Sequence, residues 1–121
     1  MTKRILVVED TEDNRQIMRD LLTAAGFEMV EAEDGAAGVA AAEREKPDLI
    51  LMDIQLPVMD GYEATRRIKA NAELKHIPII AVTSYALSGD EEKARAAGCD
   101  GYVTKPFSPR QLLAKVREHL G

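Results

Sequence analysis

The sequence predicts an α/β fold, a doubly wound five-stranded parallel sheet of strand order 2-1-3-4-5 with five helices. Two observations predict this class. Short apolar runs of strand length alternate with longer stretches that carry apolar residues at helical spacing. The middle runs are apolar at every position, as in parallel strands that helices cover on both faces. Right-handed crossovers leave few topologies for such strands, and 2-1-3-4-5 is the order that we expect.

Three continuous apolar runs predict the central strands of the sheet, at residues 5–8, 49–52 and 79–82. Two other runs suit the edges of the sheet, because residues 28–32 are more polar and residues 101–103 form a very short run. The sequence therefore predicts three buried strands flanked by two edge strands.

Each of the first two predicted helices has a recognisable end. The first stops before Gly26, a residue type that is favoured just past a helix end. Its apolar residues at helical spacing are Ile17, Leu21, Leu22 and Ala25. The second helix opens at Asp34 and is alanine-rich up to Lys46, before Pro47.

The remaining three helices begin at capping signals. Asp60 can cap a helix that runs through Ala64 and Ile68. Two later starts match the capping box, in which Ser is followed three positions later by Glu or Gln. These pairs are Ser88 with Glu91 and Ser108 with Gln111, and Pro109 occupies the first helical position after Ser108.

Composition excludes several classes of function. The chain has 121 residues, and we expect one domain over residues 1–121. No apolar run approaches the ~20 residues that span a bilayer and no export signal is present, so we expect a cytoplasmic protein with no membrane contact. Cys99 is the only cysteine, which excludes an internal disulfide. A net charge of -5 argues against nucleic-acid partners.

Polar residues follow the predicted central strands at the point where each strand ends. They are Glu9 and Asp10 after the first strand, Asp53 after the third, Thr83 after the fourth and Lys105 after the fifth. The carboxyl ends of parallel strands share one edge of the sheet, and ligands bind at that edge where the winding reverses. We therefore expect these side chains to converge.

The three carboxylates predict a metal site. Close carboxylates repel one another unless a cation lies among them, and oxygen ligands without His or Cys suit Mg²⁺. Lys105 and Thr83 add the charge and the hydroxyl that neutralise and orient phosphoryl oxygens. The chain has no Gly-rich nucleotide loop. The pattern predicts phosphoryl transfer, with Asp53 as the nucleophile that forms an acyl phosphate.

Over essentially the whole chain, these residues resemble the receiver domains of two-component response regulators, which have a flavodoxin-like fold. The family has an acidic pair, a phosphoryl-accepting Asp, a Thr or Ser and a Lys-Pro pair at successive strand ends. The matching residues are Glu9 and Asp10, Asp53, Thr83, and Lys105 with Pro106. The resemblance implies that Asp10, Asp53 and the backbone carbonyl of Gln55 hold Mg²⁺, with Glu9 acting directly or through water. It also implies a cis Lys105–Pro106 bond.

The same resemblance implies a phosphorylation switch. Tyr102 matches the aromatic residue that swings inward as Thr83 moves toward the phosphoryl group. The donor would be a histidine kinase or a phosphotransfer protein, and a downstream protein would bind the helix four, strand five and helix five face, residues 88–120. We expect a monomer that can dimerise on phosphorylation. We also expect that the protein is not an enzyme with a separate turnover substrate. Gln55 and Tyr85, which line the acceptor site, would set the dephosphorylation rate.

Within the family, residues 48–57, 76–78 and 89–92 resemble the DivK type of bacterial cell-cycle regulators. Three alternatives stay open. A haloacid-dehalogenase-type phosphatase also uses an Asp nucleophile with Mg²⁺, but it needs a second Asp where Gln55 stands. A binding module on this fold acts without phosphorylation, but such modules usually lack a site residue. The chain can also be a receiver excised from a hybrid histidine kinase, although its start at Met1 and its end after Leu120 favour a lone receiver.

Overall fold

The computed structural model describes residues 2–84 and 90–120. The strands are β1 (Arg4–Val8), β2 (Glu28–Ala32), β3 (Leu49–Asp53), β4 (Ile79–Thr83) and β5 (Gly101–Thr104). The helices are α1 (Glu12–Ala24), α2 (Gly35–Glu45), α3 (Gly61–Ala70), α4 (Asp90–Ala97) and α5 (Pro109–Leu120). Every predicted strand is present, with bounds that differ by at most one residue from the prediction. The predicted helix start at Ser88 lies outside the described residues, as does Tyr85.

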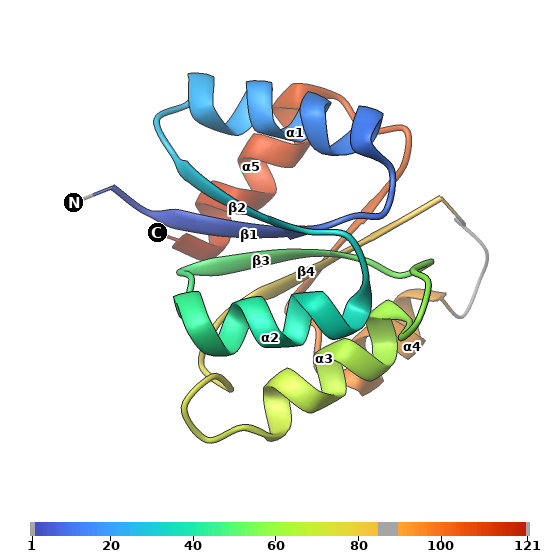
Figure 1. The fold of residues 1–121 in the computed structure, drawn as a ribbon. Helices are drawn as coiled ribbons and strands as arrows, with labels where there is room; N and C mark the ends of the chain where they lie inside the picture. The colour runs from blue at the N-terminus through green and yellow to red at the C-terminus, as the bar shows by residue number, and fades with distance from the viewer. Residues whose placement is uncertain (1, 85–89, 121) are drawn as a thin grey trace.

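The five strands form one parallel sheet in the order β2-β1-β3-β4-β5, as predicted. Figure 1 shows α1 and α5 on one face of this sheet and α2, α3 and α4 on the other. The winding reverses between β1 and β3, since β1 pairs with both β2 and β3. Sheets of this type bind their ligands at this point, outside the carboxyl ends of the strands.

Side chains of the central strands alternate between two apolar clusters, one beneath each layer of helices. In β1, Ile5 and Val7 belong to the cluster beneath α1 and α5, whereas Leu6 and Val8 belong to the cluster beneath α2, α3 and α4. β3 and β4 are buried at every position. The continuous apolar runs of the sequence therefore arise because helices cover both faces of the sheet.

The buried face of α1 differs in part from the predicted one, since Leu21 and Leu22 contact the core as predicted but Ile17 does not. The apolar spacing predicts Ile17 on this face, but 60% of Ile17 is exposed. The buried residues of α1 are Arg15, Met18 and Leu22. Met18 and Leu22 lie one turn apart on the same side of the helix, and their side chains fill the cluster above the sheet. This orientation turns Ile17 away from the sheet and Arg15 toward it.

The loop between β3 and α3 lies tightly against the end of β3. A Cβ atom on Gly61 would overlap the carbonyl oxygen of Asp53, and the Gly61 N–H donates to the Ile54 carbonyl at 3.0 Å. Asp60 caps α3, as predicted, by accepting a backbone N–H of its first turn at 2.9 Å. Val58 in this loop has a φ angle of 67°, which β-branched residues rarely adopt. The loop is therefore held close to Asp53.

Two expectations from composition concern the described residues. Within residues 2–84 and 90–120, no helix is both long enough and apolar enough to cross a membrane. Cys99 is buried, with its Sγ 3.8 Å from the Thr65 hydroxyl, and burial raises the pKa of the thiol to about 11. The thiol is therefore an unreactive packing group.

Candidate functional site

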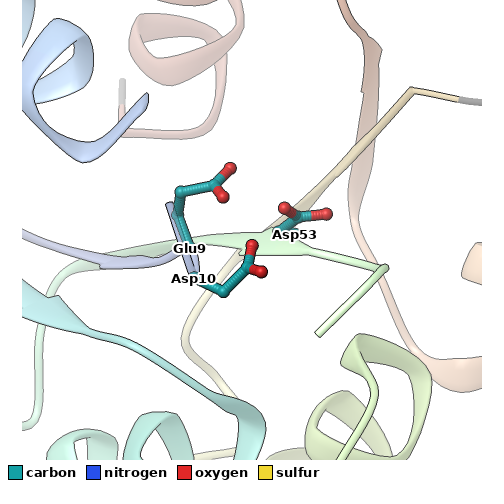
Figure 2. Close-up of side chains that lie close together, drawn as sticks. All are labelled: Glu9, Asp10 and Asp53. Carbon is teal, nitrogen blue, oxygen red and sulfur yellow. The ribbon is translucent and has the colours of Figure 1, made fainter. Parts of the chain in front are cut away.

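Three carboxylates meet at the carboxyl edge of the sheet, where the winding reverses. Glu9 and Asp10 follow β1 directly, and Asp53 is the last residue of β3. Because Val8 of β1 lies opposite Met52 of β3, the residues that come next lie side by side. Oxygen atoms of the three side chains lie within 4.8 Å of one another, and Figure 2 shows the side chains gathered at the two strand ends. The structure thus brings the sequence-predicted carboxylates together.

Lys105 joins this cluster from the end of β5. Its Nζ lies 2.6 Å from Glu9 Oε1 and 3.1 Å from Asp53 Oδ2. The Lys105 backbone N–H donates to the Thr83 carbonyl at 2.6 Å, which continues the pairing of β4 with β5 to the edge of the sheet. The Lys105–Pro106 bond is cis, as the resemblance implies. We call Glu9, Asp10, Asp53 and Lys105 the acceptor site.

The pKa values of Asp53 and Glu9 move in opposite directions. Burial raises the pKa of Asp53 to about 6, and the neighbouring Glu9 adds to this rise. Burial also acts to raise the pKa of Glu9, but hydrogen bonds from Lys105 and from the Thr11 N–H outweigh it and lower that pKa to about 2. The pKa of Asp10 is raised because Glu9 lies beside it. Negative charge on Asp53 and Asp10 is therefore incompletely compensated.

The donor set of the acceptor site fits Mg²⁺. Among the described residues, the group consists of carboxylates alone, without His or Cys. Mg²⁺ binds to oxygen ligands and commonly uses one or two carboxylates. The pKa of Asp53 is raised by burial and by Glu9, and that of Asp10 by Glu9, and a divalent cation among these carboxylates would offset both effects. The residues present could therefore hold this ion.

Gln55 links Asp53 to Thr83. Its backbone N–H donates to Asp53 Oδ1 at 3.0 Å, and its side-chain Nε2 donates to the buried Thr83 Oγ1 at 3.1 Å. The side-chain contact with Thr83 was not among the predictions from the sequence. No local pattern could reveal it, because it joins residues 28 positions apart. Tyr85, which was predicted to line the site with Gln55, lies outside the described residues.

Tyr102 lies on β5, at the edge of the sheet. Its side chain is half-buried and packs against the apolar cluster beneath α2, α3 and α4. In register it lies opposite Ala81 of β4, two residues before Thr83. It also lines surface hollows that include Arg95 of α4 and Lys115 of α5. Tyr102 therefore connects the interior behind Thr83 with the α4–β5–α5 surface.

A hollow on the α1 side of the acceptor site has an apolar wall. Lys105 forms one border of this hollow, and Ile17 of α1 and Phe107 after β5 line it. Asn14 and Ser84 add polar groups. Because 60% of Ile17 is exposed, this wall is accessible to a partner.

A doubly wound parallel sheet that carries a carboxylate cluster and a lysine at its carboxyl edge is typical of receiver-type signalling domains. A family model described as "Response regulator receiver domain" matches residues 5–117. The chain therefore belongs to the family of response regulator receiver domains. This confirms the family that the strand-end residues predicted.

Named relatives match the chain over its whole length. The polar-differentiation response regulator DivK of Brucella ovis is 45% identical over 121 residues, which are 100% of this chain and 98% of that protein. DivK of Brucella anthropi is 44% identical over the same shares. The predicted resemblance to the DivK type is thus confirmed, and the chain is a DivK-like response regulator.

Solved structures of receiver-type proteins match the fold of the chain. The receiver domain of a sensor histidine kinase from Pseudomonas aeruginosa has a TM-score of 0.93 and 40% identity, covers 100% of this chain and 99% of its own, and has a magnesium ion coordinated in its active-site cleft. The chemotaxis protein CheY4 of Vibrio cholerae has a TM-score of 0.94 and 30% identity, covering 99% of this chain and 100% of its own. The predicted fold class is therefore confirmed.

Proposed function

We propose that Asp53 of this response regulator accepts a phosphoryl group from a phosphohistidine, and that the resulting acyl phosphate switches a partner-binding surface. The observation that carries the proposal is the environment of the Asp53 carboxylate. Asp53 is only 4% exposed, and its carboxylate lies 3.1 Å from Lys105 Nζ. Oxygens of Glu9 and Asp10 lie within 4.8 Å of an oxygen of this carboxylate. A nucleophile, an acidic pair and a cation at one edge are the groups that assisted phosphoryl transfer needs.

In this proposal the cofactor is Mg²⁺, held by Asp10, Asp53 and the backbone carbonyl of Gln55. Both oxygens of Glu9 already accept hydrogen bonds, one from a backbone N–H at 3.0 Å and one from Lys105 at 2.6 Å. This favours a water-mediated role for Glu9 over a direct one. When bound, Mg²⁺ spreads the negative charge of the phosphoryl group in the transition state. The magnesium ion in the P. aeruginosa receiver domain supports this assignment.

The transfer forms one bond and breaks another. An oxygen of Asp53 attacks phosphorus to form the P–O bond of the acyl phosphate, and the P–N bond breaks with its electron pair on the donor imidazole. Because the pKa of Asp53 is about 6, this carboxylate is mostly ionised at neutral pH and ready to attack. Lys105 pairs with the phosphoryl oxygens after transfer, since its Nζ is already beside Asp53.

Thr83 and Tyr102 carry the signal away from Asp53 in this proposal. The Thr83 hydroxyl exchanges its contact with Gln55 for a hydrogen bond to the phosphoryl group. Tyr102 then turns inward from the surface, because it packs beside the strand that ends in Thr83. The acyl phosphate thereby shifts the population of the α4–β5–α5 surface toward the form that a downstream protein binds.

The donor is a histidine kinase or a phosphotransfer protein that docks beside Lys105. The exposed Ile17 and the neighbouring Phe107 offer it an apolar contact next to the acceptor site. The downstream target is a protein, because a chain with a net charge of -5 does not favour nucleic acid. We propose a monomer that can dimerise when phosphorylated.

The protein assists its own phosphorylation and dephosphorylation and turns over no separate substrate in this proposal. Gln55 stands where a haloacid-dehalogenase-type phosphatase needs its second Asp, which argues against that enzyme class. We further propose that residues 1–121 form a single domain that works in the cytoplasm. The lone, buried Cys99 suits a reducing compartment.

The experiment that tests the proposal is intact-mass measurement after incubation with acetyl phosphate, with Mg²⁺ or with EDTA. Wild type should gain one phosphoryl group only with Mg²⁺, and Asp53→Asn should gain none. Asp20→Asn is the matched control, because Asp20 is exposed on α1 and should behave as wild type. If Asp53→Asn is modified as wild type is, another residue is the acceptor. If wild type gains nothing, a phosphorylation-independent binding module becomes the better description.

A further inference from the structure

The helix α1 carries an arginine on the face that packs on the sheet. Arg15 is only 7% exposed and shares the buried face with Met18 and Leu22. Arginine is almost never buried without partners, because removing its charge from water is costly. Figure 1 shows α1 over the part of the sheet that holds β1 and β2. The partners of Arg15 come from the turn after β1, from β2 and the turn after it, and from α1 itself.

Arg15 makes two kinds of contact. Its Nη1 donates to the backbone carbonyl of Glu9 at 2.7 Å, in a buried hydrogen bond. The rest of its guanidinium pairs with carboxylates of Glu12, Glu31 at 3.2 Å and Glu33 at 3.9 Å. Arg19 shares two of these carboxylates. We call Arg15, Arg19, Glu12, Glu31 and Glu33 the arginine network.

The contact with Glu9 fixes the backbone that presents the acidic pair. The Glu9 N–H donates to the Ala32 carbonyl of β2 at 3.0 Å, and the Glu9 carbonyl accepts from Arg15. The peptide groups on both sides of this residue are therefore tied, one to the sheet and one to α1. Asp10 comes next in the chain, so the same two bonds set where its carboxylate begins.

We propose that Arg15 is a positioning residue for the metal site, acting through the Glu9 carbonyl to hold Asp10 and Glu9 in the geometry that binds Mg²⁺. This inference rests on the proposed function. Groups that orient metal ligands from behind commonly change metal affinity by about 10- to 100-fold when they are removed. An apolar side chain would fill the same face of α1 without the cost of burying a charge. The presence of a guanidinium on this buried face is explained if one of its N–H groups must reach the Glu9 carbonyl.

Arg19 provides a matched control within the same network. It pairs with Glu31 at 2.6 Å and with Glu12 at 3.2 Å, the same carboxylates that Arg15 contacts. Among the contacts of the described residues, only Arg15 bonds the Glu9 carbonyl. Arg15→Met and Arg19→Met both remove a guanidinium from the network, but only the first releases the peptide that leads to Asp10.

The test measures Mg²⁺ affinity by titration calorimetry and phosphorylation by acetyl phosphate as a function of Mg²⁺ concentration. Arg15→Met should weaken Mg²⁺ binding by about 10- to 100-fold and raise the Mg²⁺ concentration for half-maximal rate by the same factor. Its rate at saturating Mg²⁺ should stay near that of wild type, because the reacting groups are unchanged. Arg19→Met should bind Mg²⁺ as wild type does. If Arg15 had a purely structural role, Arg15→Met would lower stability without weakening Mg²⁺ binding more than Arg19→Met does.

Wild-type Mg²⁺ affinity in folded Arg15→Met, or an equal loss in Arg19→Met, would overturn the inference. If circular dichroism shows that Arg15→Met does not fold, Arg15→Lys replaces it. An ammonium group cannot serve the carbonyl and the carboxylates with one planar fork, so Mg²⁺ should bind Arg15→Lys about tenfold more weakly than wild type, at the lower end of the 10- to 100-fold loss that is typical of such groups. Wild-type affinity in Arg15→Lys would count against the inference. Failure of wild type itself to bind Mg²⁺ or take up phosphate would instead refute the proposed function.

Discussion

The acceptor site and the arginine network are built from the same kinds of side chain but differ in charge balance. In the arginine network, two guanidinium groups face three carboxylates. In the acceptor site, one ammonium group faces three carboxylates. The pKa values follow this difference. Hydrogen bonds from Arg19 lower the pKa values of Glu12 and Glu31, whereas burial, with Glu9 nearby, raises the pKa of Asp53.

This difference in charge balance distinguishes a structural cluster of acidic residues from one that can bind a cation. The arginine network nearly neutralises itself with its own side chains, and its members other than Arg15 are partly or fully exposed to water, so binding a cation there would bring little stabilisation. The acceptor site keeps uncompensated negative charge at a position where Glu9 and Asp53 are buried. That remaining charge is what a divalent cation and then a phosphoryl group can use. Changing the charge balance of either region therefore tests this difference.

Lys105→Met should have the largest effect, because within residues 2–84 and 90–120 Lys105 is the one cation that pairs with the carboxylates of the acceptor site, those of Glu9 and Asp53. The buried Glu9 would lose its ion-pair partner, and we expect the free energy of unfolding in EDTA to fall by about 3 kcal/mol, the lower end for a broken buried pair. Urea unfolding at neutral pH measures this loss. Lys115→Met is the control, since the Lys115 side chain is 41% exposed and lies 3.6 Å from Glu118, and it should change stability by at most about 0.5 kcal/mol. Equal losses in the two variants would contradict the expectation.

Mg²⁺ should stabilise the wild type by offsetting the excess negative charge of the acceptor site. At a concentration about 100 times its dissociation constant, a ligand that binds only the folded state adds about 2.7 kcal/mol. Thermal unfolding with Mg²⁺ and with EDTA measures the gain. Asp53→Asn should lose most of it, whereas Asp20→Asn should keep it. An equal gain in Asp53→Asn would mean that the ion binds to other acids.

Asp53→Asn should stabilise the metal-free protein in a pH-dependent manner. Burial raises the pKa of Asp53 from 3.8 to about 6, so the folded state holds this proton more tightly than the unfolded state does. The wild type therefore loses stability as pH rises from about 4 to about 6, and the whole penalty is present above that range. Asn has no such penalty. In EDTA at pH 7.5, the variant should be more stable by up to about 3 kcal/mol, and most of the gain should be lost near pH 4.

Urea unfolding of both proteins across this pH range provides the test. A gain that does not depend on pH would show that Asp53→Asn acts through packing and not through its charge. A loss at neutral pH would mean that the pairing of Asp53 with Lys105 outweighs burial. Either outcome would remove the contrast in charge balance between the two regions.

The fold and the acceptor site could be predicted because both depend on local patterns. Apolar runs of strand length predict the strands, right-handed crossovers limit their order to a few possibilities, and a parallel sheet then brings the ends of its strands to one edge. Glu9, Asp53 and Lys105 each stand directly at or after the end of a strand, so their meeting follows from topology alone. No knowledge of side-chain packing was needed for that step.

The contacts of Arg15 and Gln55 could not be predicted in the same way. The spacing of α1 allows two apolar stripes, one through Ile17 and one through Met18, and the charge of Arg15 disfavours the stripe that is actually buried. Arg15 is tolerated there because β2 and the turn after it bring Glu31 and Glu33 beside it. These contacts depend on how α1 is rotated on the sheet, and local sequence does not encode this rotation.

Arg19→Met should have the smallest effect on stability. The Arg19 side chain is 35% exposed, and Arg15 remains beside both Glu12 and Glu31 when it is removed. Exposed pairs contribute little and are screened by salt, so the loss should be small in dilute buffer and vanish in about 1 M NaCl, where the screening length is about 3 Å.

The loss in Lys105→Met should persist in the same salt, because its carboxylate partners are buried. Urea unfolding of both variants at two salt concentrations compares them directly. If the Arg19 loss also persisted, the arginine network would be as shielded from solvent as the acceptor site, and charge balance alone would not explain why only one of them suits a metal ion.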